Sequence, residues 1–526
     1  MNRLPQLLQD IVDNIASRPD QLALAGADGE LTYRRLGEES ARIAGALIEA
    51  GVRPGQRVGV VGHKTTAAVV SLLAVMRAGA AYVPLDPRAP VARLVDLVND
   101  AECPVVLTSA TRDRQLADTL ESSSCAKALN ARTLTVEGEP SLPNVGEESA
   151  VALCFYTSGS TGRPKGVQLS YEAISAFHAG FNELAAMDAR SRCLNMAALH
   201  FDVSLYDVWL PLRVGAVVHV GPAIPVPDVV LGLIGEQQIT HTHAVGSTMK
   251  LLAEESANFR GYDLTSLRVI LSGAEIINPQ AVQRWLEAAP NLAVINGYGP
   301  AEATATAINH VITEREPDRT EFYPIGVPPR GTEIRFRDED GRIDMDGPGE
   351  ILIAGPQLMV GYLKRPEEEA RAFLVDGGIR YYRTGDWGSR RPDGVCLFIG
   401  RRDDEIKVRG YRVNLNEINR QLEAHTEITR SFSGTAKDHN GAQLLVSAIA
   451  STELSSRLAS HSDDVCLARL PGHEERTLRG YLSECLPSYM LPDAMYSLPW
   501  LPVLSSGKPD KSLVGAWLRR AVEESS

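Results

Sequence analysis

Residues 156–167 read YTSGSTGRPKGV, and this stretch is the strongest indication of the fold of the chain and of the kind of ligand it binds. The apolar run VALCFY at 151–156 precedes it, so we expect a buried strand that leads into a loop ending at Lys165. Glycines let several backbone N–H groups converge on an anion, hydroxyls add donors, and the lysine supplies a full charge. The loop is not a Walker A motif, because Pro164 precedes the lysine and Gly166 follows it. The pattern predicts a phosphate-binding loop, the alternative being a flexible surface loop.

On both sides of this loop, short apolar runs alternate with helical patterns, which is typical of an α/β fold. A helix is expected at 67–81, and strands at 57–62, 103–109, 151–158, 216–220, 240–245, 267–273 and 291–297. The polar stretch 120–150 is interpreted as a surface crossing. Glycine-punctuated runs over 322–400 predict a small β-rich subdomain, and a compact α+β pattern follows residue 413.

The length of 526 residues is too great for one ordinary domain. We predict a large multilayered N-terminal domain over 1–402, made of two α/β subdomains plus a small β subdomain. A small, mobile α+β C-terminal domain is predicted over 403–526.

The chain carries 53 Lys and Arg against 66 Asp and Glu, a formal net charge of −13. This balance argues against nucleic acid or an anionic membrane as the main partner, but it leaves room for a local phosphate site. The first 20 residues lack an apolar core, and no later stretch approaches a spanning helix, so we expect a soluble, cytoplasmic protein. The seven cysteines show no CxxC pair and are expected to be free thiols.

The loop is accompanied by further motifs, and together they resemble the adenylate-forming superfamily of acyl-CoA synthetases, luciferases and peptide-synthetase adenylation domains. The similarity is greatest to a stand-alone amino-acid adenylation enzyme of the nonribosomal-peptide type. The motifs, in chain order, are AGAAYVPLDP (78–87), HFDVS (200–204), NGYGPAEAT (296–304), GEILIAG (349–355), YRTGDW (382–387), GRRDDEIKVRGYRV (400–413), LPSYMLP (486–492) and SGKPD (506–510).

The resemblance implies that ATP and Mg²⁺ are required and that the product is an acyl-adenylate. Glu302 would hold the metal, the alternative being an exposed loop acid; Tyr298 would stack on adenine, the alternative being a core tyrosine. Asp386 would accept both ribose hydroxyls, and Arg401 would contact ribose or phosphate, the alternative being a surface arginine. Lys508 would bridge the substrate carboxylate and the α-phosphate. The remaining positions assigned by resemblance are Thr157 and Lys165 for catalysis, and Ser158, Gly159, Ser160, Thr161, Gly162, Gly297, Gly299 and Phe398 for the nucleotide.

Two departures from the family pattern stand out. Ala301 replaces the usual threonine, which removes a hydroxyl contact to phosphate worth about 1.5–3 kcal/mol if nothing replaces it. The segment NLNEIN at 414–419 replaces a more acidic pattern, which affects the expected second half-reaction and not adenylation. The catalytic set is otherwise retained.

Asp202 matches the aspartate that pairs with the substrate α-amino group in amino-acid-activating members, the alternative being an N-cap for the helix that follows. The pocket implied by resemblance is small, which predicts alanine, serine or glycine as substrate. Its other residues are Val203, Tyr206, His243, Leu271, Gly273, Gly297, Ala305 and Thr306; His241 is an alternative to His243.

The expected reaction is activation of a small amino acid as aminoacyl-AMP with release of pyrophosphate. Transfer to the phosphopantetheine thiol of a separate carrier protein should follow, because only 16 residues come after the SGKPD element. Free coenzyme A is the alternative acceptor. A β-amino-acid ligase, an acyl-CoA ligase and a non-catalytic adenylate-binding protein remain alternative functions. Asp403 falls at the family's hinge, about which the C-terminal domain is expected to rotate between the two half-reactions.

Overall fold

The computed structural model describes residues 4–108, 114–123, 126–134, 146–157, 164–255, 259, 261–401, 405–439, 441–451, 467–498, 502 and 511–525. Its contacts divide the chain into two compact units. The first consists of Met1–Pro87, Leu97–Thr157 and Lys165–Arg402, and the second of Arg88–Asp96, Ser158–Pro164 and Asp403–Ser526.

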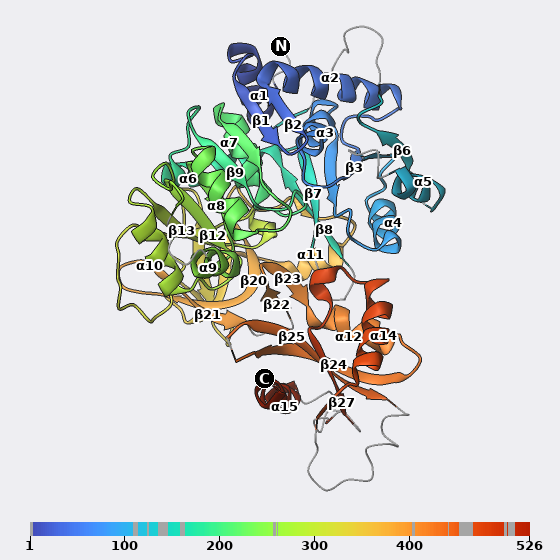
Figure 1. Cartoon of the computed structure of the whole chain (residues 1–526), viewed down its shortest axis with the longest axis vertical. Coiled ribbons are helices and arrows are strands. Elements are labelled where there is room, and N and C mark those ends of the chain that lie inside the picture. The colour runs from blue at the N-terminus through green and yellow to red at the C-terminus, as the bar shows by residue number, and fades with distance from the viewer. Residues whose placement is uncertain are drawn as a thin grey trace. The chain divides into compact units, whose positions relative to one another are not determined.

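An eight-stranded sheet forms one half of the first unit (Figure 1). Its six central strands are parallel, and β14 and β2 are antiparallel at the two edges. The carboxyl ends of the parallel strands therefore meet at one edge, where ligands bind in open α/β sheets. In spatial order the strands are β14 (Ile308–Ile312), β13 (Ala293–Tyr298), β12 (Val269–Gly273), β11 (His241–His243), β9 (Arg192–Asn195), β10 (Val217–Val220), β1 (Leu22–Gly26) and β2 (Gly29–Thr32).

A seven-stranded sheet forms the other α/β half of this unit. Five strands are parallel, and beyond β7 the sheet continues through β8 and β18, each antiparallel to the strand before it. Because β8 runs against β7, its first residue, Lys165, lies at the carboxyl end of that strand. In spatial order the strands are β18 (Gly361–Tyr362), β8 (Lys165–Ser170), β7 (Val151–Thr157), β4 (Ala81–Leu85), β3 (Arg57–Val61), β5 (Val105–Thr108) and β6 (Lys127–Asn130).

Two secondary-structure predictions need correction. Helix α3 (Thr66–Arg77) begins at the N-cap Thr65, whose hydroxyl accepts from Ala68 N, and ends four residues before the predicted position. Gly79 there has a φ of +78°, a left-handed conformation that ends helices, and Ala81 already belongs to β4. The stretch 120–150 is not only a surface crossing, because it contains β6, which pairs in parallel with β5 at the sheet edge.

Helices cover the two sheets, and their apolar sides form the cores. α3 is buried along most of its length, and the fully buried rings of Tyr82 and Trp209 pack at 5.8 Å between ring centroids. The helices are α1 (Gln6–Ser17), α2 (Tyr33–Glu49), α4 (Val91–Asp100), α5 (Arg114–Ser123), α6 (Tyr171–Ala185), α7 (Leu210–Val214), α8 (Pro227–Glu236), α9 (Gly246–Glu255), α10 (Pro279–Ala288) and α11 (Pro366–Ala372), with the π-helix η2 (Leu205–Trp209) and the 3₁₀ turn η3 (Ala301–Ala303).

The predicted β-rich subdomain is present as a six-stranded antiparallel sheet. Its long strand β20 carries the YRTGDW motif, and β21 pairs with it so that Asp386 stands opposite Arg401. The strands are β15 (Glu333–Arg337), β16 (Ile343–Asp344), β17 (Gly349–Ala354), β19 (Phe373–Asp376), β20 (Ile379–Arg390) and β21 (Cys396–Arg401).

The second unit contains a two-stranded ribbon and a four-stranded sheet with helices, as the α+β prediction required. Apolar residues of the sheet, of α12 and of α14 form a core of their own. The elements are β22 (Glu405–Val408), β23 (Tyr411–Asn414), α12 (Leu415–Glu423), β24 (Ile428–Lys437), β25 (Gln443–Ser451), β26 (Ala468–Arg469), α14 (Gly472–Ser483), η4 (Ser488–Met490), β27 (Ala494–Leu498) and α15 (Lys511–Ser525).

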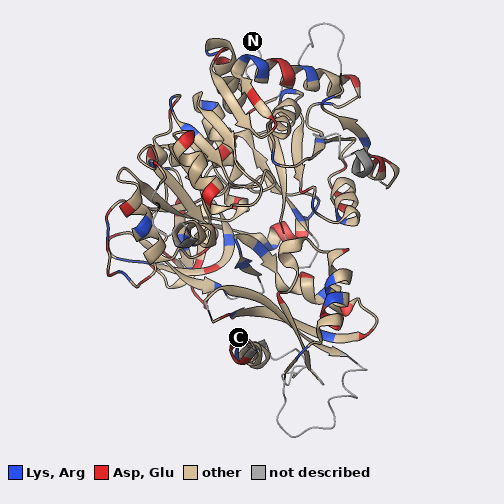
Figure 2. Cartoon of the chain, viewed as in Figure 1, with Lys and Arg blue, Asp and Glu red and all other residues tan. Residues whose placement is uncertain are grey.

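Acidic and basic side chains are mixed over the elements, as along α2, where Arg35 pairs with both Glu38 and Glu39 (Figure 2). Within the described part of the chain, no helix has the length and apolar character needed to cross a bilayer. Five cysteines lie in this part, and all are free thiols: Cys103, Cys154, Cys193, Cys396 and Cys485.

Candidate active site

The carboxyl ends of β11, β12 and β13 bring several predicted pocket residues together. His243 stands beside Leu271 in the register of β11 with β12, and Gly273 stands beside Gly297 in the register of β12 with β13. A Cβ atom at Gly273 would lie 2.7 Å from the carbonyl oxygen of Gly297. This close approach leaves no room for a side chain at position 273.

A strained turn closes the same edge. Thr304 and Ala305 after β13, and Ala274 after β12, adopt positive φ angles, a backbone conformation that is uncommon for residues other than glycine. Gln357 holds the turn, since its backbone carbonyl accepts from Thr304 Oγ1 at 2.6 Å and its side-chain amide donates to Thr306 O at 3.3 Å. The surrounding structure therefore fixes Ala305 and Thr306, both predicted to line the pocket.

The HFDVS segment leads into the π-helix η2. Leu205 N donates to Asp202 O at 2.9 Å, and Tyr206 N donates to Val203 O at 2.9 Å, so the segment turns tightly before the helix. Ser204 immediately precedes η2, and its side chain makes no capping hydrogen bond. Tyr206 is fully buried, and its ring packs edge-on against Phe181 at 5.1 Å between centroids.

Three predicted pocket residues carry polar atoms that are buried and unsatisfied by the residues the structure describes. These atoms are Tyr206 Oη, His243 Nε2 and Thr306 Oγ1. Burial, and secondly the charge of Lys64, lowers the pKa of His243 to about 4, so its ring is neutral at pH 7. By contrast His241 Nε2 lies 2.9 Å from Ala185 O, and its Nδ1 lies 2.7 Å from Thr240 Oγ1. Of the two histidines, His243 has the unused hydrogen-bonding capacity.

Asp207 is a functional candidate that sequence reasoning missed. Its fully buried carboxylate accepts from Asn195 Nδ2 at 2.8 Å and from the backbone N–H groups of Met196 and Ala197, each at 3.0 Å. Lys64 Nζ donates to the carbonyls of Asn195 and Met196 at 3.2 and 3.1 Å. The carboxylate thus joins the end of β9 to the helix that carries Tyr206. The only signal in the sequence was an acidic residue within an apolar run.

Thr157 and Lys165 face each other at the end of the β7–β8 pair. The Thr157 hydroxyl is buried and finds no partner among the described residues. Lys165 is 7% exposed, and its ammonium lies 4.5 Å from the centroid of the Tyr362 ring and 3.4 Å from the Tyr362 hydroxyl. The two ends of the predicted phosphate loop are therefore held together. Ser158, Gly159, Ser160, Thr161 and Gly162, the predicted loop positions between them, lie outside the described residues.

Glu302 is completely buried, which rules out an exposed loop acid. It lies in η3, and the Tyr362 hydroxyl donates to its Oε1 at 2.7 Å. Tyr362 therefore contacts both the predicted metal ligand and the lysine of the phosphate loop. Gly299 lies just before this turn, where a Cβ atom would come within 2.6 Å of Ala305 O.

Asp386 accepts hydrogen bonds from two other predicted nucleotide-binding side chains, those of Tyr298 and Arg401. The Tyr298 hydroxyl donates to Asp386 Oδ2 at 2.6 Å, and Arg401 Nη1 donates to Oδ1 at 2.8 Å. Burial, followed by the charge of Asp386, raises the pKa of Tyr298 well above its usual value. The side chain of Arg401 is only 13% exposed, so the surface-arginine alternative is wrong. Phe398 lies 6.1 Å from Tyr298 between ring centroids.

A family model described as AMP-binding enzyme matches residues 11–363, which include Lys165, Glu302 and the predicted pocket residues. The chain belongs to the AMP-binding enzyme family. As a member it is an adenylate-forming ligase, and its relatives are of the nonribosomal-peptide type. Phosphinothricin tripeptide synthetase PhsC of Streptomyces viridochromogenes is 33% identical over 96% of this chain. The chain spans 44% of that protein and 19% of one plipastatin synthase polypeptide of Bacillus subtilis, to which it is 30% identical.

Solved structures of this AMP-binding family confirm the predicted fold. The chain is 26% identical to holo-PA1221, described as a nonribosomal peptide synthetase protein with adenylation and PCP domains. That match has a TM-score of 0.81 and covers 98% of this chain and 84% of the other. The amide bond synthetase McbA of Marinactinospora thermotolerans is also 26% identical, with a TM-score of 0.82 and coverage of 97% and 99%.

AMP-binding enzymes use ATP, generally with Mg²⁺, and the residues here fit that pair. Among the described residues, no three His, Cys, Asp or Glu side chains gather as a metal cage. Mg²⁺ that accompanies a nucleotide needs no cage, because one or two carboxylates, phosphates and water complete its shell. Glu302, which is buried and oriented by the hydrogen bond from Tyr362, is suited to be that carboxylate. Lys508 and Asp403 lie outside the described residues.

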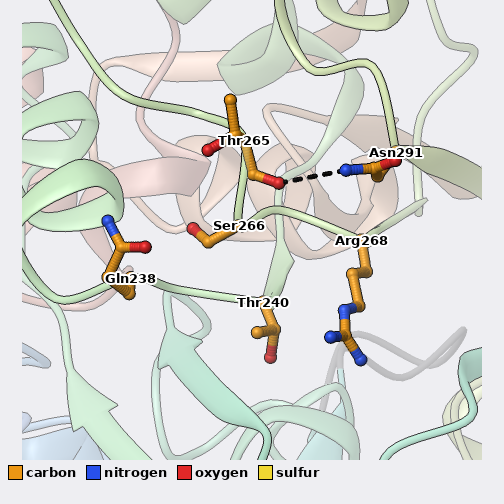
Figure 3. Close-up of a pocket in the computed structure, with 6 residues that line it drawn as sticks. All are labelled: Gln238, Thr240, Thr265, Ser266, Arg268 and Asn291. Atoms are coloured by element: carbon orange, nitrogen blue, oxygen red, sulfur yellow. Dashed lines mark hydrogen bonds between the residues drawn. The ribbon is translucent and has the colours of Figure 1, made fainter.

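A polar hollow lies at the opposite, amino ends of the strands (Figure 3). Thr240, Arg268 and Asn291 come just before β11, β12 and β13, and Asn291 Nδ2 donates to Thr265 O at 3.3 Å. None of the residues assigned to the reaction lines it. The predicted pocket residues and the turn at Thr304 and Ala305 lie instead at the carboxyl edge.

Proposed function

We propose that this chain activates a small amino acid as its aminoacyl adenylate. The observation that carries the proposal is the buried Glu302, held by Tyr362 beside Lys165, one turn away from Gly273 and Gly297 of the predicted pocket. A carboxylate oxygen of the amino acid attacks the α-phosphorus of ATP. The bond from that phosphorus to its bridging oxygen breaks, and pyrophosphate leaves with the electron pair.

The reacting carboxylate and the phosphates of ATP are both anionic, so catalysis consists mainly of charge neutralisation and alignment. Lys165 and the loop at 158–162 would bind the phosphates, and Lys508 would hold the substrate carboxylate against the α-phosphate. Asp386 and Arg401 would hold the ribose, with adenine against Tyr298. Bound Mg²⁺, held by Glu302, would neutralise phosphate charge. Asp202 would pair with the substrate ammonium group.

The pocket supports a small substrate with a hydrogen-bonding side chain. Tyr206, His243 and Leu271 occupy volume, and position 273 has no room for a side chain. Leaving His243 Nε2 and Thr306 Oγ1 buried and unsatisfied is costly, and a substrate hydroxyl would satisfy them. Among alanine, serine and glycine, these atoms favour serine.

Amino-acid-dependent exchange of labelled pyrophosphate into ATP tests this proposal. The panel includes serine, alanine, glycine, β-alanine and a fatty acid. Serine should support the fastest exchange. Exchange with the fatty acid alone would identify an acyl-CoA ligase, and exchange with β-alanine alone a β-amino-acid ligase. No exchange with any acid would indicate an adenylate-binding protein without catalysis.

We propose that the activated acyl group passes to the phosphopantetheine thiol of a carrier protein. The likeness to holo-PA1221, whose description includes a PCP domain, supports a carrier as acceptor. The likeness to the amide bond synthetase McbA favours an amine as the second candidate. Thioester formation with holo-carriers and with coenzyme A, and amide formation with simple amines, distinguish the acceptors. Transfer to coenzyme A or amines alone would overturn the carrier proposal.

A further inference from the structure

Tyr362 has a place in the site that none of the assigned motifs accounts for. It lies at the end of β18 and is 4% exposed. Its hydroxyl oxygen accepts from Lys165 Nζ at 3.4 Å, and its proton is donated to Glu302 Oε1 at 2.7 Å. One hydroxyl therefore connects an ammonium on β8 to a carboxylate in η3.

The backbone around Tyr362 is attached to both of these elements. Tyr362 pairs with Val167 in the register of β18 with β8, and Leu363 N donates to Gly166 O at 2.8 Å. On the other side, Met359 N donates to the backbone oxygen of Glu302 at 2.8 Å. The ring is thus fixed relative to Lys165 and Glu302, and the hydroxyl has little freedom to point elsewhere.

The Tyr362 hydroxyl accepts a hydrogen bond from Lys165 and donates one to Glu302, and this direction affects the orientation of both side chains. A hydroxyl that accepts from a cation becomes a better donor, and a bond to a carboxylate is among the stronger hydrogen bonds in proteins. Donation to Oε1 restricts rotation of the Glu302 carboxylate, and the ring face stabilises the ammonium of Lys165.

We propose that Tyr362 is a positioning residue of the adenylation reaction, which orients Glu302 for the metal that accompanies ATP and holds Lys165 beside it. This inference rests on the proposed function, since it assumes that Glu302 ligates the metal. Tyr362 itself does not contact the reacting atoms.

The test substitutes Tyr362→Phe, which keeps the ring and its packing and removes only the hydroxyl. Tyr381→Phe is the matched control, because the buried Tyr381 also donates to a glutamate, Glu333 Oε1, at 2.7 Å in the β-rich sheet. ATP binding is measured by calorimetry over a series of Mg²⁺ concentrations. Losing a bond to a charged group predicts that Tyr362→Phe needs about tenfold more Mg²⁺ for half-maximal ATP binding. Tyr381→Phe should stay within about twofold of the wild type.

A double-mutant cycle with Glu302→Gln, measured by pyrophosphate exchange, tests whether Tyr362 acts through Glu302. The tyrosine substitution should lower exchange about tenfold in the wild-type background and less than about twofold beside Glu302→Gln. The inference is overturned if Tyr362→Phe has the Mg²⁺ dependence of Tyr381→Phe, or if its effect is equal in both backgrounds. Wild type without Mg²⁺-dependent ATP binding would overturn the proposed function, and Tyr362's role with it.

Discussion

Burial raises the pKa of the Asp207 carboxyl to about 6, against the opposing effect of its three hydrogen-bond donors and of Lys64. Its folded-state pKa thus lies above the unfolded value near 3.8. The contribution of this group to stability is therefore complete below about pH 4 and is lost as the pH rises through about 6. We expect binding of the amino acid to have the opposite pH dependence, because only the ionised carboxylate accepts all three hydrogen bonds that hold the segment carrying Tyr206.

We predict that the KM for the amino acid falls as the pH rises from 5 to 7 in the wild type. Asp207→Asn should remove this dependence and raise KM about tenfold at pH 7.5, because an amide cannot accept from all three donors. Pyrophosphate exchange across this pH range measures both effects. Asp263→Asn, a change in an exposed turn, is the control. An unchanged pH profile in Asp207→Asn would refute the role of Asp207.

Substitution of Lys508 should affect the adenylation step much more strongly than it affects ATP binding. If it aligns the substrate carboxylate with the α-phosphate, Lys508→Ala should lower adenylation by about a hundredfold or more while ATP still binds. Transfer from a preformed adenylate should persist. Lys437→Ala, an exposed lysine of β24, should change none of these rates. Near-normal exchange in Lys508→Ala would refute the assignment.

At the scale of elements, the approach of β12 to β13 sets the depth of the pocket. Gly273→Ala would push a methyl group to 2.7 Å from Gly297 O, and the backbone must move to relieve the clash. We predict a loss of about 1–3 kcal/mol in the free energy of unfolding, together with a large fall in exchange activity. Thermal melting and kinetics measure the two effects.

Gly480→Ala is the control for Gly273→Ala, because it makes the same substitution at a position with free space. A Cβ atom at Gly480 on the exposed side of α14 meets nothing within 4 Å, so alanine should be neutral or stabilising there by up to about 1 kcal/mol. If Gly273→Ala and Gly480→Ala had the same stability and the same exchange activity, the close approach of β12 to β13 would not limit the depth of the predicted pocket.

For the whole molecule, the prediction concerns motion between the two half-reactions. Adenylation and thioester formation require different groups at one site, and we propose that 403–526 rotates about Asp403 to exchange them. Asp403→Pro should slow thioester formation at least tenfold more than adenylation, because proline fixes φ near −65°. Asp403→Ala keeps the backbone free and should leave the ratio of the two rates unchanged. Equal loss of both half-reactions in Asp403→Pro would argue against a hinge.

The sequence by itself determined the fold class and the positions of seven strands in the two α/β sheets. Apolar runs bounded by glycine and polar residues identified β3, β7, β10 and β12 to within a residue or two, because strand patterning is a local property. The motifs identified Glu302, Asp386 and Arg401 as site candidates. Even so, the chain pattern did not reveal β6, whose four residues KALN become a strand only by pairing with β5.

Only the tertiary structure decided which side chains meet. Lys165, Glu302 and Tyr362 are separated by 60 to 197 residues, yet one hydroxyl joins them. Asp207 looked like an ordinary acid on a helix until the end of β9 supplied its donors. Likewise His241 and His243 are equivalent in sequence, but Ala185 O on α6 lies within hydrogen-bonding distance of His241 Nε2, whereas His243 Nε2 is buried without a partner among the described residues. Periodicity reports which face of an element is buried, but hydrogen-bond partners depend on register and packing between distant segments, which no local pattern encodes.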